Sequence, residues 1–166
     1  MSSLGGAAPK VSRFQRGLSG FPMSITAGPR RALWFTEGVG PNLQATVGRI
    51  TTGGKITEFH RGISGHMYAG SAPIAMGSDK NLWFADTSNR GGAAAPSAIG
   101  RITPLGRVKL FRKGITGTIN DLTPGPDGNI WFTQSLCTNG CRGVRPSVGR
   151  ITPSGAVRVF TKGLHR

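Results

Sequence analysis

Few side chains in this sequence could act as acids, bases or metal ligands. The 166 residues include six acidic residues, three histidines and two cysteines. Glu37, Asp86 and Gln134 stand out because each follows a Trp-Phe pair at the same spacing. Their oxygen atoms suit a metal ion or another cationic group, provided that folding brings them to one face of the molecule. The alternative is that these side chains cap turns and contact water.

Other polar residues are expected on the same face as these three. They are His66, Tyr68, Asn120 and Asp121. No zinc site is predicted, because His60, His66 and His165 have no further ligands at a suitable spacing.

The two cysteines, Cys137 and Cys141, enclose the sequence Thr-Asn-Gly. A turn at Asn-Gly would allow a local disulfide between them, which would suit an extracytoplasmic protein. Two free thiols in a cytoplasmic protein are the alternative, so the compartment stays open.

The chain is strongly basic, with 21 Lys and Arg residues and a net charge of +15. Such a charge favours anionic partners such as nucleic acid, anionic lipid or wall polymers. Nucleic acid is disfavoured because the few aromatic residues recur at positions expected in the core, which leaves no stacking surface. Four of the bases precede a glycine at the end of a repeated motif, and two lie beside the cysteines. The candidates for anion binding are Arg16, Arg61, Lys113, Arg142, Arg145 and Lys162.

These residues must be positioned by a repeat that fills most of the chain. The Trp-Phe pairs begin at Trp34, Trp83 and Trp131, and a Gly-Arg-Ile run follows each pair. A period of about 50 residues indicates one supersecondary unit stacked several times.

Each unit is expected to contain four antiparallel strands, which we term a to d. In the first unit they span about 23–27, 32–36, 46–51 and 55–60, separated by Gly, Pro, Asn and Asp. No stretch sustains the spacing of an amphipathic helix. The Pro-Asp-Gly turn before the third Trp places Gly128 where a positive φ is expected. Four short strands per unit are typical of a β-propeller blade.

The predicted fold is therefore all-β, with three complete blades over about 21–62, 70–114 and 118–163. An orphan strand d over 11–18 precedes them, and residues 1–10 are expected to be disordered without a signal peptide or membrane span. Propellers close with four to eight blades, so the chain is either part of a longer propeller or completes a ring by oligomerisation.

Most repeated residues are expected to have structural roles. The three tryptophans should pack one blade against the next, and Phe14, Phe59, Phe111 and Phe160 should lie in the same cores. The arginines of the Gly-Arg-Ile runs should form structural hydrogen bonds. The b–c loops over 38–45, 87–98 and 135–147 are long and differ between units, so ligand binding is expected on the face that carries them.

Three strings resemble the repeats of virginiamycin B lyases, the propellers that inactivate streptogramin antibiotics. They lie at 47–51, 54–59 and 129–133, and the resemblance covers about residues 11–164. It implies a seven-bladed propeller and a magnesium-dependent elimination that opens a cyclic depsipeptide at its ester bond. Mg²⁺ is implied by this resemblance only.

The catalytic histidines of that family stand at the start of strand a. The corresponding positions here are Met23, Ala72 and Asn120, none of which can take a proton as imidazole does. A further family glutamate just past strand b has near matches in Glu37, Asp86 and Gln134. Besides a lyase, the sequence is compatible with a non-catalytic binding module or scaffold that recognises an anionic ligand or polymer through the b–c loops.

Overall fold

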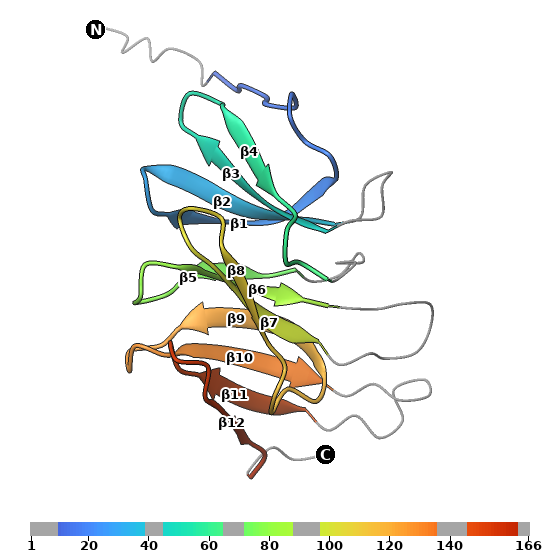
Figure 1. Ribbon diagram of the computed structural model, residues 1–166, viewed down its shortest axis with the longest axis vertical. Coiled ribbons are helices and arrows are strands. Elements are labelled where there is room, and N and C mark those ends of the chain that lie inside the picture. Colours follow the sequence, from blue (N-terminus) through green and yellow to red (C-terminus); the bar gives the residue numbers. More distant parts are fainter. Residues whose placement is uncertain (1–9, 39–44, 65–71, 88–96, 136–145, 163–166) are drawn as a thin grey trace, which may run out of the picture.

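A computed structural model describes residues 10–38, 45–64, 72–87, 97–135 and 146–162. This part of the chain contains twelve strands and no helix, arranged as three four-stranded antiparallel sheets (Figure 1). The all-β prediction is confirmed, and the sheets are consistent with propeller blades. Blade 1 contains β1 (Phe21–Gly28), β2 (Ala32–Gly38), β3 (Thr46–Thr51) and β4 (Ile56–Phe59). Blade 2 contains β5 (Ile74–Met76), β6 (Leu82–Asp86), β7 (Ala98–Ile102) and β8 (Val108–Phe111). Blade 3 contains β9 (Thr118–Pro124), β10 (Ile130–Ser135), β11 (Ser147–Ile151) and β12 (Val157–Phe160).

The three blades share one register between their second and third strands. In blade 1, Trp34 pairs with Arg49 and Phe35 with Gly48, and the same pairs recur in the other two blades. A Cβ atom on Gly48 would lie 2.2 Å from the Phe35 ring. The glycine of each Gly-Arg-Ile run is therefore required because an aromatic ring lies directly on the backbone.

Neighbouring blades pack through aromatic residues. Trp34 is completely buried between blades 1 and 2, and Trp83 is 1% exposed between blades 2 and 3. Their rings stack on Phe59 and Phe111 at centroid distances of 5.4 and 5.5 Å. The predicted packing role is confirmed for these two tryptophans. Trp131 lies on the outer side of blade 3 and is partly exposed.

The repeated arginines cover the tryptophan rings. Arg49, Arg101 and Arg150 stand 5.7 to 5.9 Å from the ring centroids of the tryptophans in their own blades. Arg101 also donates a 2.7 Å hydrogen bond from Nη1 to the Pro153 carbonyl, which joins blade 2 to blade 3. The predicted structural role is confirmed for Arg101.

The predicted strand over 11–18 is wrong, because these residues form no strand and belong to none of the three sheets. A fourth blade strand is held by hydrogen bonds to the third strand of its own sheet, and no described residue supplies one here. The aromatic contact of such a strand is nevertheless present. A Cβ on Gly54 would lie 2.3 Å from the Phe14 ring, just as one on Gly106 would meet Phe59.

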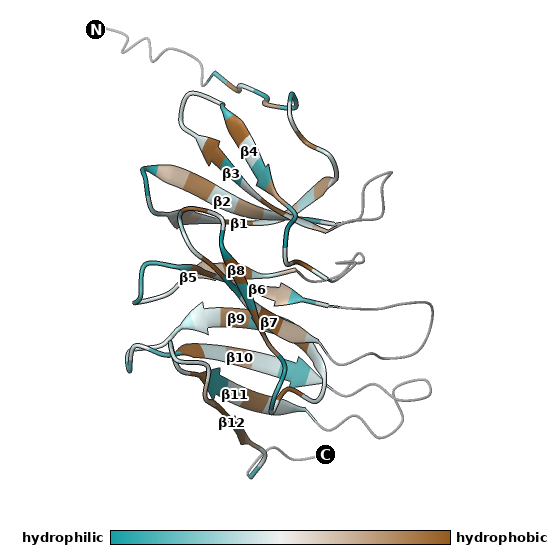
Figure 2. Cartoon of the chain, viewed as in Figure 1, coloured by the Kyte–Doolittle hydropathy of each residue, from teal (hydrophilic) through white to brown (hydrophobic). Residues whose placement is uncertain are grey.

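Hydrophobic residues alternate with paler or hydrophilic ones along the strands, and the turns between the first and second strands of the blades are hydrophilic (Figure 2). No helix in the described part of the chain is long and apolar enough to cross a membrane.

Candidate functional site

The ends of the second strands form the candidate site predicted from the sequence. Because the strands are antiparallel, the ends of β2, β6 and β10 lie at the same edge as the starts of β3, β7 and β11 (Figure 1). We call this edge the loop face. It carries Glu37, Asp86 and Gln134, whose exposed fractions are 0, 0 and 2%. These polar side chains are thus buried at the loop face, one in each blade.

In blade 3, Gln134 forms hydrogen bonds both to the linker that precedes the blade and to the start of the third strand of the blade. Its Nε2 donates to Ser147 Oγ at 3.1 Å and to Thr116 Oγ1 at 3.3 Å, and its Oε1 accepts from the Thr116 amide at 3.4 Å. Thr116 lies between blades 2 and 3, whereas Ser147 begins β11. The glutamine therefore fixes the linker against the start of the third strand.

In blade 2, Asp86 holds the preceding linker in the same way. Its Oδ2 accepts hydrogen bonds from the amide and the hydroxyl of Ser64 at 3.1 and 3.0 Å. Arg112 Nη2 also donates to Ser64 Oγ, at 2.6 Å. The Oδ1 atom of Asp86 is buried without a hydrogen-bond partner among the described residues.

In blade 1, the corresponding group is the buried carboxyl of Glu37. Thr46 Oγ1 donates to Glu37 Oε2, and the amide of Ser19 donates to the neighbouring Glu58 Oε1 at 2.7 Å. The pKa of Glu37 is raised to about 7, chiefly by burial and in addition by the nearby Glu58, although the hydrogen bond from Thr46 lowers it. This carboxyl is therefore largely protonated in mildly acidic solution.

A sequence model of the virginiamycin B lyase family matches residues 7–164. The chain belongs to the virginiamycin B lyase family. A search of curated proteins gave no match.

The positions that match the catalytic histidines of the virginiamycin B lyase family carry no imidazole. Met23 is partly buried on β1, and Ala72 is buried just before β5. Asn120 is exposed on β9, where its Nδ2 donates to Ser135 Oγ at 3.2 Å. Beside it, Asp121 is exposed and accepts a hydrogen bond from the Leu122 amide. None of these positions supplies a strong general base to this member of the family.

The Mg²⁺ implied by the lyase family does not fit the described residues. Glu37 and Asp86 lie in different blades. Glu37 accepts a hydrogen bond from the Thr46 hydroxyl, and Asp86 accepts one from the Ser64 hydroxyl. Within the described ranges, no three His, Cys, Asp or Glu side chains form a group that could hold a metal ion. The alternative prediction placed these side chains in turns in contact with water, whereas the structure buries them and bonds Asp86 and Gln134 to linker residues.

The predicted cationic residues are exposed where the structure describes them. Three of them follow the fourth strand of a blade. The other, Arg16, follows Phe14, which contacts Gly54 as the phenylalanine of a fourth strand contacts its glycine. They are Arg16, Arg61, Lys113 and Lys162, and none forms an ion pair with a described residue. The remaining predicted site residues, His66, Tyr68, Cys137, Cys141, Arg142 and Arg145, lie outside the described residues.

The sequence-based prediction missed the hydroxyl residues that hold the linkers. Ser19, Ser64 and Thr116 each stand two residues after a glycine with positive φ. This recurrence is visible in the sequence and could have identified them.

The sequence-based prediction also missed a hydrogen bond between an aspartate and a tryptophan in the turn between the first two strands of blades 2 and 3. Trp83 Nε1 donates to Asp79 Oδ1 at 3.1 Å, and Trp131 Nε1 donates to Asp127 Oδ1 at 2.9 Å. Although burial opposes it, hydrogen bonds from Asn81 and Trp83 lower the pKa of Asp79, and hydrogen bonds from Trp131 and Asn129 lower that of Asp127. In blade 1, Arg30 stands at this position instead.

Proposed function

We propose that this member of the virginiamycin B lyase family binds an anionic ligand or polymer on its loop face without turning it over. The observation that carries the proposal is the recurrence of an exposed cation after the fourth strand of each blade, at Arg61, Lys113 and Lys162. The carboxyl groups of Glu37 and Asp86 are buried at the same face, so they offer the solvent little negative surface to offset these cations.

Electrostatic attraction is the physical basis of this function. The net charge of +15 raises the local concentration of anions around the whole protein, and exposed side chains at one face focus it there. Binding that releases condensed counterions weakens as salt is added, in proportion to the number of charges neutralised.

The test is a titration of labelled inorganic polyphosphate, followed by fluorescence anisotropy over a series of NaCl concentrations. Saturable binding that weakens with salt is expected. The double variant Arg61→Glu with Lys113→Glu should bind at least tenfold more weakly. Its control, Lys55→Glu with Arg107→Glu, changes the net charge equally at exposed residues on the opposite edge, beside the turns between third and fourth strands.

Two results would contradict loop-face binding. Affinity that does not change with salt would exclude an electrostatic ligand site. Equal losses in the two double variants would show that only the net charge attracts the anion.

Lyase activity is the second candidate, and family membership favours it. In the elimination, a base removes the proton next to a carbonyl, a carbon–carbon double bond forms and the ester oxygen leaves as a carboxylate. Since Met23, Ala72 and Asn120 supply no such base, we expect this chain to produce no linear depsipeptide with added Mg²⁺ while an active lyase does so in parallel. Sustained turnover by the purified chain would replace the binding proposal with the lyase proposal.

A further inference from the structure

The outer side of blade 1 and the outer side of blade 3 correspond to the two sides that pack together inside the stack. In both inner interfaces, the side of one blade that bears the tryptophan packs on the side of the next blade that bears the following phenylalanine. We call these sides the Trp face and the Phe face. Among the described residues, no blade covers the Phe face of blade 1 or the Trp face of blade 3.

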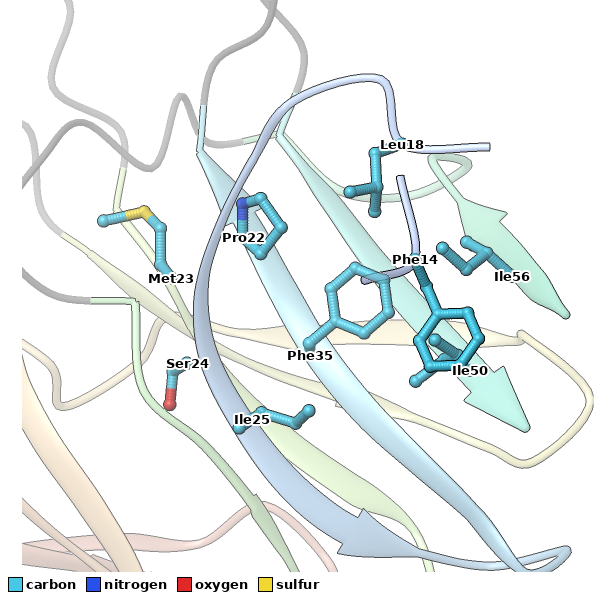
Figure 3. A pocket seen from close by; sticks show the side chains of 9 residues that line it. All are labelled: Phe14, Leu18, Pro22, Met23, Ser24, Ile25, Phe35, Ile50 and Ile56. Atoms are coloured by element: carbon cyan, nitrogen blue, oxygen red, sulfur yellow. The ribbon is translucent and has the colours of Figure 1, made fainter. Parts of the chain in front are cut away.

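The Phe face of blade 1 exposes apolar residues that are buried in the other blades. Ile25 is 60% exposed and Leu33 is 41% exposed, whereas the equivalent Ile74 and Leu82 of blade 2 are 6% and 0% exposed. A cavity of about 290 Å³ lies on this face (Figure 3). Its lining is almost wholly apolar and includes Phe14, Ile25, Phe35, Ile50 and Ile56.

The Trp face of blade 3 offers the matching side chains. Trp131 is stacked on Phe160 at a centroid distance of 5.5 Å, as the other tryptophans are on their phenylalanines, but it remains partly exposed. Trp131, Val148, Phe160 and Lys162 line a cavity of about 240 Å³ on this face. The exposed Thr133 corresponds to Thr36, whose Oγ1 donates to the Ala72 carbonyl across the interface between blades 1 and 2.

We propose that the Phe face of blade 1 binds the Trp face of blade 3 of a second copy of this chain, head to tail. The inner interfaces specify the contacts. Trp131 of one copy packs on the apolar residues around Leu33 of the other. Arg150 reaches the Thr52 carbonyl, as Arg101 reaches that of Pro153, and Thr133 reaches the Met23 carbonyl, as Thr36 reaches that of Ala72.

Charge complementarity supports this pairing. Ser78 Oγ donates to the Gly128 carbonyl at 2.7 Å, so the first turns of blades 2 and 3 lie side by side. The same arrangement between two copies places Asp127 of one blade 3 beside Arg30 and Arg31 of the other blade 1. Asp127 already accepts a 2.9 Å hydrogen bond from Arg150 Nη1 in its own blade. Its turn carries no other charged residue, and it meets the one first turn that carries two arginines.

The segment over 11–18 occupies part of the proposed docking site. Phe14 lies over Gly54 where Phe160 of the second copy would lie, since Phe111 lies over Gly155 in the same way. The segment is not paired with a strand, and its backbone hydrogen bonds are few. The second copy therefore replaces the segment with a complete fourth strand, β12, on docking.

Sedimentation velocity of the full chain over a range of concentrations tests the proposal. We expect the mass to rise reversibly above that of one chain. The variants Leu33→Glu and Thr133→Glu each place a charge on one outer face at an exposed position, and each should stay monomeric. Leu105→Glu is the matched control, because Leu105 is 70% exposed in a turn, and it should associate like the parent.

Mixing the two monomeric variants distinguishes head-to-tail pairing from other modes. The mixture retains one unaltered Phe face and one unaltered Trp face, so it should form a dimer that neither variant forms alone. Phe14→Ala should strengthen self-association of the parent by opening the site. A parent that is monomeric at every concentration, single variants that still associate while circular dichroism shows them folded, or a mixture that stays monomeric would each overturn the proposal.

Discussion

Glu37, Asp86 and Gln134 occupy one position in three blades, but only the glutamine cannot lose a proton. All three are buried, and Asp86 and Gln134 each bind the amide and the hydroxyl of a linker residue. Asp86 accepts from the Ser64 hydroxyl, whereas Gln134 donates to the Thr116 hydroxyl. A buried carboxylate must be paired or protonated, because loss of hydration disfavours its charged form. In blade 1, the buried Glu37 is protonated in mildly acidic solution, and this makes the stability of the folded chain depend on pH.

Replacing Glu37 with Gln should remove a pH dependence of stability. The pKa of Glu37 is raised from 4.5 to about 7 in the folded protein, so between these values the folded state binds more protons than the unfolded state. The stabilisation is complete below the lower value and is lost as pH rises through about 7. Urea denaturation of the parent at pH 5 and pH 8 should show this loss, which Glu37→Gln should lack. The exposed Asp121→Asn is the control, and an unchanged pH dependence in Glu37→Gln would contradict the assignment.

Truncation of the tryptophans should show how much blade packing contributes. Trp83→Ala leaves a void between blades 2 and 3 and should cost about 3–5 kcal/mol of unfolding free energy. Trp131→Ala should cost clearly less in the monomer, because its ring is already partly exposed. Denaturant titrations below the concentration of any self-association measure both. Equal losses would mean that the two environments are equivalent.

At the scale of the strand, the aromatic ring over each glycine determines what the third strand can contain. The Phe84 ring would lie 2.2 Å from a Cβ on Gly100, and both residues are in the centre of their sheet. Gly100→Ala should therefore destabilise the chain by about 1–3 kcal/mol through overpacking. Gly53→Ala is the matched control, because the nearest atom to its added Cβ is 3.8 Å away. Similar melting of the two variants would show that the ring can move aside.

The strands were predictable because their signals are local. The prediction for 46–51 coincides with β3, and Gly128 has the expected positive φ of 76°. The segment 11–18 has the sequence of a fourth strand but not its structure, since strand formation requires a partner that the sequence pattern does not reveal. The candidate site was predicted in position only. Its chemistry depends on contacts between Asp86 and Ser64, or Gln134 and Thr116, that only the packing of linkers creates.

For the whole molecule, the effect of the net charge on self-association opposes the effect of the apolar outer faces. A net charge of +15 on 17.4 kDa repels itself, whereas the apolar outer faces of blades 1 and 3, which no blade of the described chain covers, favour association. Added salt screens the repulsion, with a Debye length that falls from about 10 Å at 0.1 M to about 3 Å at 1 M. Salt should therefore strengthen folding and face-to-face docking but weaken binding of anions at the loop face.

Thermal melting in two salts of equal ionic strength should separate these effects. Screening by NaCl should raise the melting temperature of the parent and of Arg61→Glu with Lys113→Glu, by less in the variant because less repulsion remains. Sodium phosphate should raise it further in the parent, because an anion that binds the folded state stabilises it by mass action. Phosphate also stabilises proteins by exclusion from their surfaces, and the variant measures that general part alone. If the melting temperatures in phosphate and in chloride differ by the same amount in the parent and the variant, the cations after the fourth strands form no anion site. The basic residues then act only through the net charge of the chain.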